Sequence, residues 1–362
     1  MVKEMKEKVV NLSIKDSQDI SLLKGVAILL VLFIHANVSS YVPGFEEKSA
    51  IGVYTQVITR VLVDNAVPMF FLVSGFLFFL KKDTYAIKWK KRFKSLVIPY
   101  LFWCFIGFLI PFILQRVLGL DKFFTGSDLK KIADFEIIDY LRMFWDIRDG
   151  APILSTMWFL RNLIVLIALT PIIELLLKKL GYFFVILLTI IYLFLPFAVP
   201  GISSSSLWWF TVGCSSTLIG GGKLFSCISR LSGLLTMVIW FISLFMIVLS
   251  YYYDWHYELL HRLFMVVHFI GIFKLLSYIS SKCSTSRLRK VAVASFFIYA
   301  VHEPWMGYGM GVCFKVIQFP SIGLYIAPFI FVAFATVFSY LAYLILKKVA
   351  PSALNVITGS RT

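Results

Sequence analysis

A lysine and a histidine share one apolar run near the N-terminus. Residues 22–35 read Leu-Leu-Lys-Gly-Val-Ala-Ile-Leu-Leu-Val-Leu-Phe-Ile-His, so Lys24 and His35 are the ionisable residues of this run. An ionisable group within a bilayer is costly unless it is paired or hydrated, and it therefore indicates a functional site. Eleven residues return both side chains to nearly the same helix face, about 16 Å apart along the axis. This spacing suits a long anionic molecule, bound at Lys24, whose reactive tip reaches His35.

The composition indicates that lipid surrounds most of the chain. Hydrophobic residues make up 60% of the 362 residues, and the mean hydropathy is +0.87. The first apolar run has no convincing cleavage site after it and is expected to be retained. We predict an all-α integral membrane protein, a bundle of about ten helices of about 20 residues each. The expected spans are 20–39, 60–80, 95–118, 154–177, 182–199, 207–222, 231–252, 259–279, 292–313 and 322–346.

The distribution of Lys and Arg predicts the orientation. With a cytoplasmic N-terminus, most cations fall on the inner side, including the run from Lys88 to Lys94, and such an excess sets topology. Both termini are therefore expected in the cytoplasm. The predicted organisation is a cytoplasmic segment 1–19, a single membrane domain 20–348 with an extracytoplasmic loop 119–153, and a cytoplasmic tail 349–362.

Charge and cysteine usage limit the partners. The formal net charge of +16 is explained mainly by topology and by contact with anionic membrane lipids, so nucleic acid is not expected as a partner. The five cysteines lack paired spacing and fit neither a disulfide framework nor a zinc site. They are expected to be small core residues, and no metal is expected.

Polar residues of four expected spans fall at a similar depth. The first span brings His35 to its outer third, and the second carries Asn65 at its mouth and Ser74 near its middle. The fourth and ninth spans add five further residues in their outer parts. Because these residues lie at a similar depth, they indicate a functional site more strongly than the scattered polar residues of an ordinary helix bundle do. The added residues are Trp158, Arg161, Tyr299, His302 and Glu303.

Each of these residues also has a purely structural interpretation. His35 can be a hydrogen-bonded packing residue, and His302 with Glu303 can form a structural interhelical pair. Arg161 can neutralise a carboxylate such as Asp64 or Asp149. Lys24 can extend to the interface as a topology signal.

Structural roles are equally open for four further residues. Trp158 can belong to an interfacial aromatic belt, and Gly75 is expected to let two helices approach closely. His256 and His261, near an outer loop, are expected at the surface.

Five stretches carry a resemblance to a known family. They are Leu23–His35, the run Val67-Pro-Met-Phe-Phe-Leu-Val-Ser-Gly-Phe76, the basic-then-Pro-Tyr segment Lys91–Tyr100, Met157–Leu160, and Phe297-Ile-Tyr-Ala-Val-His302. In order and spacing they resemble the acyltransferase-3 family of integral-membrane acyltransferases, particularly its short members that O-acetylate bacterial cell-surface glycans. Lys24 stands where the family usually has arginine, and Ser95 where another arginine is common, so a bidentate phosphate contact would become a point charge.

The resemblance implies an O-acetyltransferase (acyltransferase) that uses acetyl-CoA, or another acyl-CoA, as donor. Lys24, Arg92 and Ser74 would bind the donor. His35 would act as general base, since an imidazole pKa near ~6.5 suits proton transfer at neutral pH, or would form a transient acyl-imidazole. Arg161 and His302 would complete the catalytic group. Trp158, Tyr299, Glu303 and Asn65 would contact the acceptor.

The same resemblance implies a glycan or lipid-linked sugar as acceptor and polysaccharide modification as the outcome. The expected location is the bacterial cytoplasmic membrane (the cell inner membrane), as a multi-pass protein for which an oligomer stays possible. The alternative function is a transporter or flippase of a glycan precursor without acyl transfer. Against it, the sequence has no visible inverted repeat and no corresponding Gly/Pro-broken spans.

Overall fold

The computed structural model describes residues 12–42, 44–119, 131–146, 151–317 and 319–360. Within these ranges the chain is almost entirely helical, apart from one antiparallel hairpin of β1 (Ala198–Val199) and β2 (Ile202–Ser203). Parts of the segments 1–19 and 119–153 and the end of the segment 349–362 lie outside the described residues. The α-helices are α1 (Ile14–Ile34), α2 (Ala50–Gln56), α3 (Ala66–Phe78), α4 (Tyr85–Arg92), α5 (Ile98–Phe112), α6 (Ile137–Arg142), α7 (Trp158–Ala168), α8 (Thr170–Leu180), α9 (Tyr182–Phe194), α10 (Ser204–Leu218), α11 (Leu224–Arg230), α12 (Gly233–Tyr253), α13 (Tyr257–Lys282), α14 (Ser286–Val316), α15 (Ser321–Val349) and α16 (Pro351–Thr358).

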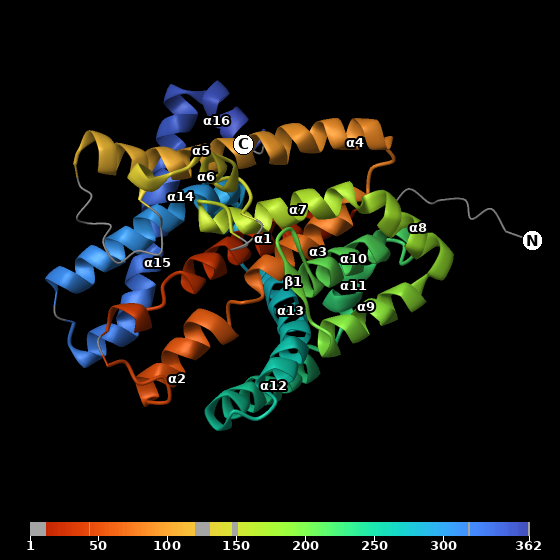
Figure 1. Ribbon diagram of the computed structural model, residues 1–362. Helices are drawn as coiled ribbons and strands as arrows, with labels where there is room; N and C mark the ends of the chain where they lie inside the picture. Colours follow the sequence, from red (N-terminus) through yellow and green to blue (C-terminus); the bar gives the residue numbers. More distant parts are fainter. Residues whose placement is uncertain (1–11, 43, 120–130, 147–150, 318, 361–362) are drawn as a thin grey trace, which may run out of the picture.

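Short 3-10 and π-helical segments extend several of these helices. In the order of the chain they are η1 (Ser39–Tyr41), η2 (Val57–Val61), η3 (Phe93–Val97), η4 (Ile113–Val117), η6 (Ile132–Asp134) and η7 (Ser155–Met157). Segment η2 joins α2 to α3, and η3 and η4 flank α5, so that α4 and α5 follow one another along one side of the molecule (Figure 1).

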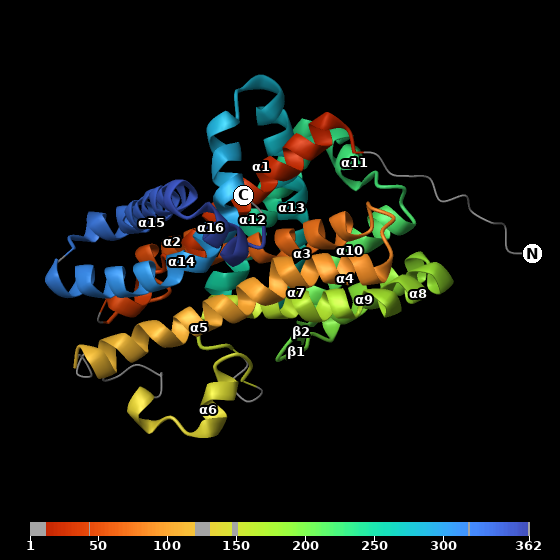
Figure 2. The same ribbon diagram turned by 90° about the horizontal axis from the view of Figure 1, so that it is seen from above.

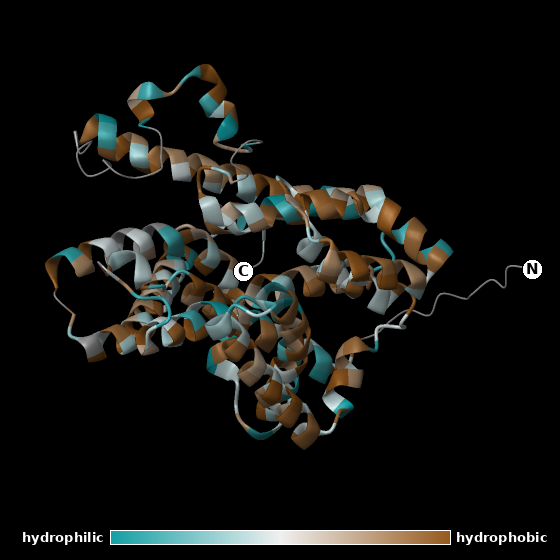
Figure 3. Cartoon of the chain, turned by 60° about the horizontal axis from the view of Figure 1, so that its bottom comes forward, coloured by the Kyte–Doolittle hydropathy of each residue, from teal (hydrophilic) through white to brown (hydrophobic). Residues whose placement is uncertain are grey.

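Six helical stretches of the described residues are long and apolar enough to cross a membrane. They comprise α1 with η1, α2 through α3, α4 through η4, α12, α13 and most of α15, and α8 with α9 would make a seventh. Apolar residues cover most of these helices, with polar residues gathered toward their ends and in the loops (Figure 3). The prediction of a helical multi-pass membrane protein is confirmed. The count of about ten spans is not confirmed, and the cytoplasmic location of the termini stays a prediction.

The difference from the expected spans has local causes. The expected span 154–177 is divided at Leu169 between α7 and α8, because Pro171 has no backbone N–H to continue the helix. Gly181, with φ of 58°, lets α8 and α9 meet at 116°. The expected span 207–222 is the 15-residue α10, and 292–313 lies within α14, whose mean hydropathy is lowered by charged residues.

Five helices form the centre of the molecule. Helix α1 packs against α3 and α14, α3 packs against α10, and α7 begins beside α14 through η7. The pair α12 and α13 extends away from this centre, and α15 flanks α14 on another side (Figures 1 and 2). Helix α12 presents mostly exposed apolar side chains, as expected of a helix in contact with lipid.

Gly75 and Gly213 bring α3 and α10 into backbone contact. A Cβ atom at Gly75 would lie 2.1 Å from the carbonyl oxygen of Phe210, and one at Gly213 would lie 2.1 Å from that of Leu72. The Thr217 hydroxyl adds a hydrogen bond of 2.9 Å to the carbonyl of Phe76 across this contact. The expected role of Gly75 in close helix approach is therefore confirmed.

Gly75→Ala is expected to prevent normal packing of α3 on α10. The added methyl group meets backbone rather than a movable side chain, so the helices must separate, and overpacking of this kind costs about 1–3 kcal/mol or more. Fluorescence-detected size-exclusion chromatography after mild heating measures the effect as a lower yield of monodisperse protein. Gly307→Ala is the matched control, because a Cβ there has nothing within 4 Å. Equal thermal stability of both variants would contradict this packing.

Candidate active site

A first cavity of about 360 Å³ lies among α1, α3, α7, α14 and the end of α4. We call it the inner cavity, because this end of the molecule is the one predicted to face the cytoplasm. Lys24 and Arg92 line it, together with Ser21, Ser74 and Ser295, and the remaining wall is largely apolar. The three residues predicted to bind the donor, Lys24, Arg92 and Ser74, are thus brought to one cavity although they come from three different helices.

An outer cavity of about 510 Å³ lies beyond the C-terminal end of α1. His35 lines this cavity, as do Trp158 from α7 and Tyr299 from α14. Its wall is more polar than that of the inner cavity, because it also contains Arg60, Asp64, Glu258, His261 and Arg262, with hydroxyl groups from Thr156, Ser204 and Ser205.

The two cavities meet at four shared side chains. Val31, Val67, Phe159 and Tyr299 line both, one from each of the helices α1, α3, α7 and α14. Helix α1 is continuous from Ile14 to Ile34, with His35 as its C-terminal cap, so the rise of about 16 Å from Lys24 to His35 holds. A cation therefore lies at one end of this cavity pair and an imidazole at the other. We call the four shared side chains the constriction.

The His302 ring lies next to the His35 ring. The two imidazole rings are 4.9 Å apart between centroids and inclined at 66°. His302 is completely buried, and its Nδ1 lies 2.8 Å from the carbonyl oxygen of Tyr299 and 3.2 Å from that of Ile298. In the part of the chain that the structure describes, its Nε2 has no hydrogen-bond partner.

Tyr299 and Glu303 fasten α14 to the start of α7. The Tyr299 hydroxyl donates to the carbonyl oxygen of Thr156, and the Glu303 carboxylate accepts from the Ser155 hydroxyl and, at 3.2 Å, from the backbone N–H of Thr156. Glu303 does not line either cavity. These contacts fix the backbone that carries Trp158 and Phe159 into the cavities. The only hydroxyl proton of Tyr299 is used here, so this group is not free to donate to a substrate.

Arg161 and Asn65 are not brought to the cavities. The guanidinium of Arg161 lies 5.5 Å from the ring of Trp145 and within 3.4 Å of the Asn162 side-chain oxygen. The Asn65 amide donates to the carbonyl oxygen of Met265 at 2.7 Å. Neither residue lines the inner or the outer cavity. Two carboxylates were considered as partners of Arg161. Asp64 pairs with His261 and forms no ion pair of 4.0 Å or less with Arg161, and Asp149 lies outside the described residues.

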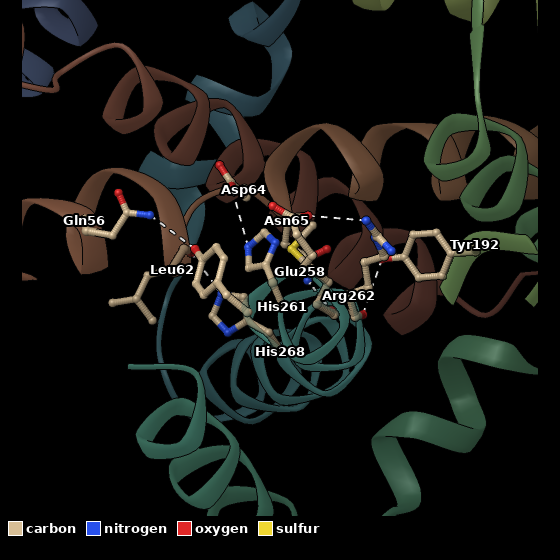
Figure 4. A network of polar contacts seen from close by, with 11 residues as sticks. Gln56, Leu62, Asp64, Asn65, Tyr192, Glu258, His261, Arg262 and His268 are labelled. Atoms are coloured by element: carbon tan, nitrogen blue, oxygen red, sulfur yellow. Dashed lines mark hydrogen bonds and ion pairs between the residues drawn. The ribbon is translucent and has the colours of Figure 1, made fainter. Parts of the chain in front are cut away.

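A network of charged residues at the start of α13 was not expected from the sequence. His261 lies 3.4 Å from the Asp64 carboxylate, and Arg262 contacts Glu258 at 3.3 Å and the carbonyl of Leu193 at 2.9 Å (Figure 4). The expectation that His261 is a surface residue was wrong, because it is half-buried in the cavity wall, whereas His256 is exposed. The spacing of Glu258, His261 and Arg262 at i, i+3 and i+4 places them on one helix face and was a usable signal.

A basic cleft of about 570 Å³ adjoins the inner cavity. It shares Leu77 and Arg92 with that cavity. The Lys91 ammonium donates to Asp83 at 2.6 Å, and this hydrogen bond holds the pKa of the Asp83 carboxyl below its usual value. Arg92 lies over the Phe78 ring, at 5.9 Å from its centroid. Four lysines line the cleft: Lys81, Lys88, Lys91 and Lys94.

The C-terminal helix α16 supports this end of the molecule. The Trp103 indole donates to the carbonyl oxygen of Ile357 at 2.9 Å, and a Cβ at Gly359 would lie 2.5 Å from the Cα atom of Ser95. Gly359 and Ser360 line the basic cleft. The expectation that all five cysteines are core residues was correct for Cys104 and Cys214, whereas Cys227 and Cys283 are exposed.

The described residues thus enclose a basic inner cavity, a constriction and an outer cavity with an imidazole. Residues 17–347 match the model of the acyltransferase-3 family, described as an acyltransferase domain. The chain therefore belongs to this family and is a membrane acyltransferase. No match was found among curated proteins or among solved structures.

Proposed function

We propose that this protein transfers an acetyl or other short acyl group from cytoplasmic acyl-CoA to a hydroxyl group of a cell-surface or lipid-linked glycan. The single observation that carries the proposal is the alignment of Lys24 and Arg92, the constriction and His35 along two adjoining cavities. The donor's phosphates would lie at the cationic end, and its thioester would reach His35 past the constriction.

The inner end of the molecule favours a long anionic donor. Arg92 lines both the inner cavity and the basic cleft, so a single molecule in contact with it can place phosphates in the cleft and a slender arm in the cavity. The cavity wall beyond Lys24 is apolar, which suits an uncharged arm. Lys88 lies 5.0 Å from the centroid of the Phe78 ring, at the wall of the same cleft.

Neutralising these cations is expected to weaken donor binding selectively. Lys24→Gln and Arg92→Gln should each raise the KM for acyl-CoA about 10-fold, since a charge-assisted phosphate contact contributes roughly 1.5–3 kcal/mol, with a smaller change in kcat. Lys24→Arg should lower the KM, because arginine contacts phosphate in a bidentate manner. Steady-state transfer rates at varied donor concentration measure both effects. Lys179→Gln, on an exposed lysine outside the cavities, is the control. An unchanged KM in both neutralised variants would contradict this donor site.

The outer cavity suits a carbohydrate acceptor. Trp158 offers a partly exposed indole face, and the wall carries charged and hydroxyl groups that can hydrogen-bond sugar hydroxyls. The Thr156 hydroxyl oxygen is buried and has no hydrogen-bond partner among the described residues. It can therefore form a hydrogen bond with a hydroxyl group of the acceptor sugar. Trp158 thus serves the acceptor, while Glu303 and Tyr299 act by holding α7.

The proposed chemistry needs one base and correct positioning. His35 removes the proton of the acceptor hydroxyl, the oxygen attacks the thioester carbonyl, and the C–S bond breaks. The proton then passes from His35 to the thiolate, so that an ester and CoA thiol leave. The thioester is already activated, and holding both reactants at His35 supplies much of the rate. Ser74 of α3 also lines the inner cavity, on the path proposed for the donor.

The test is acyl transfer by the purified protein in lipid nanodiscs. Radiolabelled acetyl-CoA is offered with candidate oligosaccharides and lipid-linked sugars, and label in the glycan is the expected result. Mass spectrometry of the surface polysaccharide from cells with and without the gene identifies the acceptor. Movement of a glycan precursor across vesicles with no label transfer would overturn the proposal in favour of a flippase.

A further inference from the structure

The Nε2 atom of His302 is a buried acceptor that lacks a partner. Two carbonyl oxygens lie beside Nδ1, at 2.8 and 3.2 Å, and a carbonyl can only accept, so Nδ1 carries the proton. In the neutral ring Nε2 is then an acceptor. This atom has no hydrogen-bond partner among the described residues, and the residue is fully buried. Buried polar atoms are rarely left unpaired, so this one requires an explanation.

The surroundings of His302 leave His35 as the partner. His302 does not line the inner or the outer cavity, so a substrate in either cavity does not reach it. His35 does line the outer cavity, and its ring contacts the His302 ring edge to face at 4.9 Å. His35 is the C-terminal cap of α1, and among the described residues its ring makes no hydrogen bond that would compete with a rotation toward His302.

We propose that His302 is a positioning residue that fixes the tautomer of His35. In the reacting state one ring N–H of His35 donates to Nε2 of His302, and the other ring nitrogen, without a proton, faces the outer cavity as the base. His302 keeps its own Nδ1 proton on the carbonyl oxygens throughout. When His35 takes the acceptor proton, Nε2 of His302 also stabilises the resulting imidazolium. This inference rests on the proposed function.

The backbone of α14 makes this arrangement rigid. The Tyr299 carbonyl that receives the Nδ1 proton belongs to the residue whose hydroxyl is bound to Thr156. The Glu303 carboxylate, next in the chain to His302, is held by Ser155 and Thr156. His302 is therefore set in place by contacts on both sides of it, as a residue must be if it is to orient another.

The test compares His302→Phe with His302→Gln in nanodiscs. Phenylalanine fills the space without an acceptor, and glutamine restores an acceptor oxygen. We expect His302→Phe to lower kcat about 10- to 100-fold with little change in the KM for acyl-CoA, and His302→Gln to recover part of the loss. Nitrogen-15 spectra of histidine-labelled protein should show one tautomer of His35 in the wild type and a mixture in His302→Phe. Single substitutions of the five histidines assign the signals.

His268→Phe is the matched control. This histidine is equally buried, and both of its nitrogens have partners, the Trp240 indole at 2.6 Å and the Leu62 carbonyl at 2.9 Å. His268→Phe should change the stability of the protein but leave the nitrogen-15 signals of His35 unchanged. The inference would be overturned if His302→Phe keeps the wild-type kcat and shows the same single tautomer of His35 as the wild type. The proposed function would be unaffected by that result, since the wild type would still transfer acyl groups. Absence of transfer by the wild type would instead overturn the proposed function.

Discussion

His35→Ala is expected to give a folded, membrane-inserted protein that no longer transfers acyl groups. His35 is the imidazole at the far end of the two adjoining cavities, and it lines the outer cavity at the end of α1, whereas His261 lines it from α13. Removing a positioned general base costs about 10²- to 10⁴-fold in rate. The measurement is the initial rate of label transfer from acetyl-CoA, normalised to monodisperse protein.

The variant series for His35 needs two controls. His256→Ala removes an exposed histidine and should leave the rate unchanged. His35→Gln keeps a polar side chain at the helix end but cannot accept a proton at neutral pH, so it should be as inactive as His35→Ala. Transfer at the wild-type rate by either His35 variant would show that the imidazole is not the base.

Closing the constriction is expected to have the second largest effect. Val31 of α1 and Val67 of α3 line both cavities, so a phenyl ring at either position fills space where the two cavities adjoin. Val67→Phe should lower kcat/KM for the donor about 100-fold, because misplacement of a reacting group by about 1 Å can cost that much. Binding of CoA itself should persist, since the cations are untouched. Isothermal titration with CoA and steady-state transfer rates separate the two effects.

The opposite change tests the same passage. Val67→Ala widens the constriction and should improve transfer of acyl groups longer than acetyl relative to acetyl. Val337→Phe, on an exposed position of α15, is the control for the added ring. Normal kcat/KM in both Val67→Phe and Val31→Phe would mean that the thioester reaches His35 by another route.

The sequence predicted the composition of this site better than its geometry. The hydropathy and the spacing of Lys24 and His35 along one helix placed the cation and the imidazole correctly, because a single helix has a fixed rise and period. From the similar depth of residues on four spans, the sequence predicted one polar group. Two of its members line the cavities, Ser74 the inner one and Trp158 the outer one.

Depth alone could not predict which face of a helix a residue occupies. Arg161 was expected beside the other site residues, yet it contacts Trp145 from the loop before α7. Asn65 contacts the backbone of α13, and Glu303 holds the start of α7. The rotation of α7 and α13 about their axes depends on tertiary packing, and the bend between α8 and α9 changes which helices lie next to one another. The polar network of Asp64, His261 and Arg262 followed from the same packing.

The most direct measurement is covalent labelling by a donor analogue with a reactive tip. A haloacetyl thioester of CoA, offered to the protein in nanodiscs, should alkylate His35, as found by peptide mass spectrometry. Excess CoA should prevent the labelling, and Lys24→Gln and Arg92→Gln should weaken it. Labelling of other residues with His35 unmodified, in a protein that still transfers acyl groups, would contradict a thioester path from the inner cavity to His35.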